Sequence, residues 1–120
     1  MLALSCFVNT VILVGRAGQN PEIRYLDSGK ILSFFNLAVD RPKTSPEAEG
    51  RTDWFKIEAW GRQASVAHEY IKKGSLIGIR GRVEIRLHAE HAVPEMVIHC
   101  VNLRLLGSRH DVVPPRSDVT

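Results

Sequence analysis

The chain has 120 residues, of which 44% are hydrophobic and 24% are charged, with a formal net charge of +3. This size and apolar content fit one compact domain, and the small basic excess is compatible with a polyanionic partner without requiring one. No apolar run approaches the roughly 20 residues that cross a bilayer, and the first residues lack the basic start of a secretion signal. We therefore expect a cytoplasmic protein that does not bind membranes.

The first third of the chain alternates between apolar and polar residues. It predicts a first strand over residues 7–16 and an extended continuation over residues 22–26, with Gly15 and Gly18 at the bend between them. Turn residues then lead into a second strand over residues 31–39. The polar segment that follows contains two prolines and is predicted to be a long loop.

Residues 53–62 alternate strictly and predict a third strand. One of its faces is apolar and should point into a core. The other face carries Trp54, Lys56, Glu58 and Trp60. The Cα atoms of the two tryptophans should lie about 20 Å apart, which suits two separate stacking platforms for bases. Burial of both indoles under a loop or at a subunit contact remains an alternative.

Residues 61–74 change to a helical period, and the end Lys72-Lys73-Gly74 is typical of a helix C-terminus. A fourth strand is predicted over residues 75–88, with Gly81 at a bend or bulge. Its predicted inward residues are Ile77, Ile79, Val83, Ile85 and Leu87. Its outward residues are Arg80, Arg82, Glu84, Arg86 and His88. A last strand is predicted over residues 95–106.

This order of three strands, a helix and two strands is that of an all-β fold, the five-stranded Greek-key oligonucleotide-binding (OB) barrel, with its helix between strands three and four. We expect residues 1–107 to form this domain and residues 108–120 to form a short flexible tail.

The outward face of the fourth strand suggests a ligand. Three arginines on one strand face repel one another unless an anion shares the face, and Glu84 relieves part of this repulsion. A solvated strand on the outside of a barrel is the alternative. Together with the tryptophans and Lys56 of the third strand, these arginines provide the aromatic and cationic groups that bind single-stranded nucleic acid.

The stretches NTVILVGRAGQNPEIRY, DWFKIEAWGRQASVAHEYIKKGSLIGIRGRVE and LRLLGS resemble the bacterial and plastid single-stranded DNA-binding protein over about residues 7–107. The resemblance implies a homotetramer that coats single-stranded DNA in replication, recombination and repair, in the cytoplasm at the nucleoid. Trp54 matches a stacking tryptophan, Trp60 stands where the family usually has a stacking phenylalanine, and Phe55 matches a position implicated in subunit association. The matching basic positions are Arg24, Lys56, Arg62, Lys73 and Arg86.

Two departures from that family affect the expected binding. Lys43 and His88 stand where many members carry further tryptophans, and both neighbouring loops are shorter than usual. We therefore expect fewer stacked bases and a steeper loss of affinity with salt. The chain ends in PPRSDVT without the acidic tip by which replicative members recruit other proteins, so its protein partners are left open.

Other functions remain as alternatives. One is a dimeric replication-restart barrel, similar to primosomal replication protein B. Another is a tail-less paralogue with a structural or interaction role, in which both tryptophans lie at subunit contacts. A hydrolase or nuclease is a distant third.

Neither an enzyme nor a cofactor is expected, because the sequence holds no nucleophile motif and no phosphate-binding glycine loop. Cys6 and Cys100 should be free, buried thiols. A group of possible metal ligands lacks the paired spacing of closed zinc sites, so no metal is expected. Its members are His88, Glu90, His91 and His99-Cys100.

Overall fold

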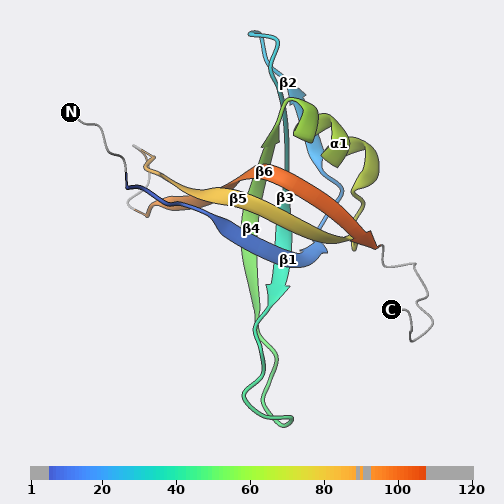
Figure 1. Cartoon of the computed structure of the whole chain (residues 1–120), viewed down its shortest axis with the longest axis vertical. Coiled ribbons are helices and arrows are strands. Elements are labelled where there is room, and N and C mark those ends of the chain that lie inside the picture. Colours follow the sequence, from blue (N-terminus) through green and yellow to red (C-terminus); the bar gives the residue numbers. More distant parts are fainter. Residues whose placement is uncertain (1–5, 89, 91–92, 108–120) are drawn as a thin grey trace.

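The computed structural model describes residues 6–88, 90 and 93–107 (Figure 1). The elements are β1 (Val11–Ala17), β2 (Glu22–Tyr25), β3 (Ile31–Asp40), β4 (Thr52–Trp60), α1 (Arg62–Tyr70), β5 (Leu76–Arg86) and β6 (Glu95–Gly107). The expected tail, residues 108–120, lies outside the described residues, so the division into domain and tail stays a prediction.

Five of the strands close into a barrel. The sheet order is β1-β5-β6-β4-β3-β2, and a further pairing between β1 and β3 joins its ends. The β4–β6 pairing is parallel and the others are antiparallel. Strand β2 lies outside this ring as the partner of β3 alone. The structure thus confirms the predicted all-β barrel, with its helix after the third barrel strand, here β4.

The core fills the barrel and continues under the helix. Alternate residues of the barrel strands point inward, and Ala67 and Ile71 close the core at the α1 end. The buried strand residues are Ala17, Phe35, Leu37, Ile57, Ala59, Ile77, Ile79, Ile98 and Cys100. Burial of each large aliphatic or aromatic side chain contributes about 1.5–3 kcal/mol, so this cluster supplies most of the driving force for folding.

Two predicted boundaries were too wide. Residues 6–10 are not in a strand, because β1 pairs with β5 only from Val11 onward. The helix ends at Tyr70, and Ile71 is extended because its apolar side chain is buried in the core. Gly74 does adopt a positive φ of 90°, but it does so in a separate turn closed by Ser75 and Lys72.

The prediction that Ile85 and Leu87 point into the core was wrong for the single chain. Their side chains are 60% and 81% exposed. Strand β5 pairs with β1 only as far as Gly81, and beyond that point β6 is its single strand partner. The end of the β5–β6 hairpin therefore projects from the barrel, where its apolar face has no interior to enter (Figure 1). Cys6 was also expected to be buried, but it is exposed.

Two glycines allow the backbones to approach closely enough to close the barrel. A Cβ atom at Gly15 would collide with the carbonyl oxygen of Ala38 at the β1–β3 pairing. A Cβ atom at Gly81 would collide with the carbonyl oxygen of His99. The β5–β6 register shifts between Arg80 and Gly81, which confirms the predicted bulge.

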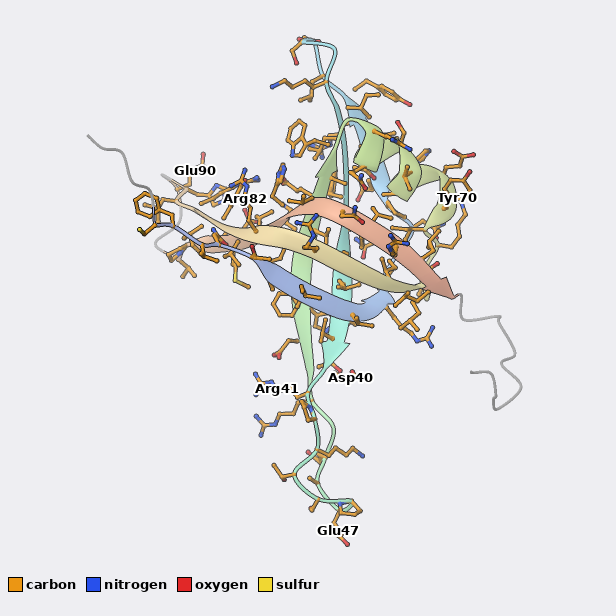
Figure 2. The ribbon with its side chains drawn as sticks, in the orientation of Figure 1. Asp40, Arg41, Glu47, Tyr70, Arg82 and Glu90 are labelled. Carbon is orange, nitrogen blue, oxygen red and sulfur yellow. The ribbon has the colours of Figure 1, made fainter. Side chains whose placement is uncertain are left out.

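The segment between β3 and β4 forms a long arm with Glu47 near its tip (Figure 2). At its base Arg41 makes a forked ion pair with Asp53, at N–O distances of 2.9–3.1 Å. The hydroxyl of Thr52 donates to Asp40 at 2.7 Å. The arm is therefore fixed where it leaves the barrel.

No helix among the described residues is long and apolar enough to span a membrane.

Candidate nucleic-acid interface

The outward face of β4 carries Trp54, Lys56, Glu58 and Trp60. The predicted division of the strand is confirmed by Ile57 and Ala59, which are fully buried on the opposite face. The face is not uniformly exposed to water. Trp54 is 60% exposed, Lys56 and Trp60 are half-buried, and Glu58 is buried.

Trp54 lies over the turn that follows β1. A Cβ atom at Gly18 would stand only 2.6 Å from Cζ3 of the indole, so the ring rests directly against the glycine backbone. The amide of Gly18 donates to the carbonyl of Asn36 at 2.8 Å, which fixes this turn against β3. The indole is thus held against this turn near Cζ3 and Cη2, while 60% of the residue remains open to solvent, as a stacking platform requires.

Trp60 borders an open pocket of about 620 Å³ at the other end of β4. This volume lies within the range typical of ligand sites. The other lining residues are Gly29, Lys30, Ile31, Gly61, Glu84, Arg86 and His99. An aromatic wall and a charged rim are therefore brought together from four segments of the chain.

Strand β6 separates β4 from β5, so the outward faces of these two strands are not adjacent. His99 of β6 lies in register with Glu58 on one side and with Arg82 on the other. Arg86 of β5 reaches past β6 and binds both carboxylate oxygens of Glu58 at 2.7 and 2.8 Å. It also binds one oxygen of Glu84 at 3.0 Å. Together with Arg82, these residues form a network of ion pairs on the outward surface of β4, β6 and β5.

This network changes the role that was predicted for Arg82 and Arg86. Arg82 also binds Glu84, at 2.9 Å, and the nearest nitrogen of His99 lies 3.8 Å from the same carboxylate. The pKa of Glu84 is lowered, mainly by the hydrogen bond from Arg86 and further by the charges around it. Mutual repulsion of the arginines is thus relieved by carboxylates of the protein itself.

Lys56 and His88, two other residues predicted to bind DNA, both contact the carboxylate of Glu95. Glu95, at the start of β6, accepts from Lys56 at 3.2 Å and lies 2.9 Å from Nε2 of His88. The pKa of Glu95 is lowered by the hydrogen bond to His88 and then by Lys56. Nucleic acid would have to displace this carboxylate to reach either partner.

The remaining predicted cations do not form one row. Arg62 is exposed at the first position of α1, Lys73 is exposed in the turn after it, and Lys43 lies on the arm. Arg24, on β2, covers the ring of Phe34 at 5.0 Å. Arg80 lies with the apolar side chains of β1 in a different pocket, away from Trp60. The cations are therefore distributed around the barrel.

Phe55 packs partly buried against the core, so a role at a subunit interface stays a prediction. Among the described residues, no group of three or more histidine, cysteine or acidic side chains is arranged to hold a metal. His91, one of the candidate ligands, lies outside those residues.

Sequence reasoning missed Phe34 and Glu95 of this surface, and it named His99 only as a possible metal ligand. Phe34 follows from the alternation of β3, since its neighbour Phe35 is buried and Phe34 must therefore face outward. Glu95 has no such signal, because its contact with Lys56 depends on the position of β6 beside β4. The position of His99 next to Glu58 likewise depends on the parallel β4–β6 pairing.

Residues 8–98 match the model of the single-strand binding protein family. Over 108 residues the chain is 45% identical to single-stranded DNA-binding protein 1 of a Synechocystis species, covering 87% of this chain and 88% of the relative. It is 37% identical over 108 residues to single-stranded DNA-binding protein 1 of a Nostoc species, covering 87% of each. A Thermosynechococcus vestitus single-stranded DNA-binding protein is 44% identical over 77 residues, covering 64% of this chain and 61% of the relative.

Proposed function

Because this chain belongs to the single-strand binding protein family, we propose that the outward face of β4 and its surroundings bind single-stranded DNA without catalysis and with little sequence preference. The observation that carries the proposal is the placement of Trp54 and Trp60 on one outward strand face, with Lys56 between them and with Lys30 and Arg86 lining the pocket beside Trp60. Bases of any sequence stack on aromatic rings, and phosphates need only positive charge.

In this mechanism each indole receives one base. Trp54 offers a ring that contacts the turn at Gly18 near Cζ3 and is otherwise largely exposed. Trp60 offers the aromatic wall of its pocket. Each stacked base contributes about 1–3 kcal/mol, so the two rings together supply a large part of the affinity.

Phosphates would first meet the exposed cations, chiefly Arg62, Lys73 and Lys43. Lys56 and His88 join after the carboxylate of Glu95 is displaced. Each phosphate that is neutralised on a single strand contributes about −0.7 to the slope of log affinity against log salt. Binding should therefore weaken steeply as salt rises.

We also propose a homo-oligomer, with a homotetramer as the expected state. Its support is an apolar strip on the outside of β1 and β6, where Ile12, Val14 and Leu106 are each more than half exposed. Exposed apolar patches of this kind are typical of association surfaces. Light scattering would distinguish a tetramer from a dimer as multiples of the 13.4 kDa chain. A dimer would favour the replication-restart alternative.

Titration of the tryptophan fluorescence with oligo-dT tests the stacking mechanism. We expect quenching at low salt and a loss of about 1–3 kcal/mol of binding free energy in Trp54→Ala. Tyr70→Ala is the matched control, because Tyr70 is exposed on α1 and lies on the other side of the molecule from Arg82 (Figure 2). Absence of quenching at low salt, or equal losses in both variants, would reject the stacking role.

A further inference from the structure

Phe34 stands on the same outward surface as Trp60. Across the β3–β4 pairing Leu32 faces Trp60 and Phe34 faces Glu58, so Phe34 is a diagonal neighbour of the indole. Diagonal pairs of this kind have Cα atoms about 7–8 Å apart, within reach of aromatic side chains. Its ring is half-buried, whereas the adjacent Phe35 is almost fully buried in the core.

Phe34 also lies beside the part of β4 between the two tryptophans. Trp54 and Trp60 are separated by about 20 Å of extended strand, too far for one base to contact both. Glu58 lies within this interval, and Phe34 is its partner across the sheet. A strand running from one indole to the other therefore passes beside this ring.

Arg24 covers Phe34 in the free protein. Its guanidinium carbon lies 5.0 Å from the ring centroid, and its side chain is exposed. Within the part of the chain that the structure describes, Arg24 makes no ion pair. The cation is thus held mainly by the ring and can leave it for a stronger anionic partner.

We propose that Phe34 is a third base-stacking position and that Arg24 leaves the ring for the phosphate of the nucleotide that stacks there. This inference rests on the proposed function. An exposed cation–π contact favours the covered state by a factor of about 2–5. A stacked base favours the bound state by a factor of about 5–150, and the arginine gains a phosphate as well. The exchange therefore favours DNA.

The first test removes the aromatic ring and the cation separately. Phe34→Leu should weaken oligo-dT binding at least about five-fold at fixed salt with an unchanged salt slope, because stacking releases no ions. Arg24→Met should reduce the slope by about 0.7. Tyr70→Leu is the matched control. Melting curves of each variant separate a loss of binding from a loss of fold. Phe34→Leu binding within two-fold of the wild type would overturn the inference.

The second test places a reporter at the site. In a protein carrying Trp54→Phe, Trp60→Phe and Phe34→Trp, the single tryptophan should be quenched by oligo-dT. If this protein binds in a mobility-shift assay without quenching, Phe34 is not a stacking position, whatever Phe34→Leu does to affinity. If the wild type itself neither binds nor is quenched, the proposed function fails together with this inference.

Discussion

Replacement of Arg86 by methionine tests whether this residue serves the fold or the DNA. Its guanidinium binds both oxygens of Glu58, whose side chain is only 6% exposed. Methionine preserves much of the apolar stem but leaves that buried carboxylate without a cation. Loss of one partner from a fully buried pair costs about 3–5 kcal/mol. Because the Arg86 side chain is 35% exposed and water screens the pair, we expect a loss of about 2–3 kcal/mol.

Urea denaturation at pH 7 and at one protein concentration would measure this loss. With the slopes usual for small domains, the midpoint should fall by about 1–2 M urea. The double variant Glu58→Gln/Arg86→Met should recover most of the stability, because no buried charge is then left unpaired. The reverse effect is expected for Arg62→Met, where the arginine is exposed and makes no ion pair among the described residues. That variant should keep its stability and lose affinity for DNA.

Two results would contradict this reasoning. One is an Arg86→Met protein that is as stable as the wild type and loses as much DNA affinity as Arg62→Met. The other is a double variant with Glu58→Gln that remains as unstable as the single one. The first would mean that Arg86 is primarily a phosphate ligand, as the family resemblance implies. The second would mean that the unpaired carboxylate of Glu58 is not the cause of the lost stability.

Three other substitutions or treatments have equally definite outcomes. Gly18→Ala should displace the Trp54 ring and weaken DNA binding with little change in melting temperature, which near-ultraviolet circular dichroism and a fluorescence titration would detect. Glu95→Gln should tighten binding about two- to five-fold at low salt by releasing its partners. The pKa of Glu95 is lowered, so its ion pairs stabilise the fold above about pH 4.5 and are lost as the pH falls through the lowered pKa. The Glu95→Gln variant should therefore lose less stability than the wild type as the pH is lowered from about 5. A thiol reagent should modify Cys6 alone in the native protein, because burial raises the pKa of Cys100 to about 11, and modification of both thiols without urea would contradict the core position.

The barrel strands could be predicted because burial imposes a period of two on them. In β4 the apolar side chains of Ile57 and Ala59 enter the core and alternate with Lys56, Glu58 and Trp60 on the outward face, and this contrast is visible in the sequence alone. The order of strands and helix then leaves few folds to consider. The same alternation failed at Ile85 and Leu87, because an apolar face is buried only where another element covers it. The sequence does not show that β5 continues beyond the end of its pairing with β1.

The composition of the surface was harder to predict than its location. Trp54 and Trp60 could be found because they interrupt an otherwise polar strand face. Glu84 could be expected to relieve part of the charge of the arginines, but the pairing of Arg86 with Glu58 could not be predicted. Glu58 reaches Arg86 only because β6 runs parallel to β4 and brings β5 within range. A pairing between segments so distant in the chain has no local signal. For that reason a guanidinium that looked available for a phosphate is engaged by the protein itself.

The close backbone contacts at Gly15 and Gly81 limit how this barrel can vary. In a library of random single substitutions selected for folding, both positions should reject every side chain, since each Cβ would meet a carbonyl oxygen. Gly78, only three residues before Gly81 on the same strand, has ordinary contact space and should accept alanine. Neither of the two restricted glycines belongs to the outward face of β4. Invariance of a residue among related chains would therefore identify the positions where barrel strands approach closely as readily as the surface that binds DNA.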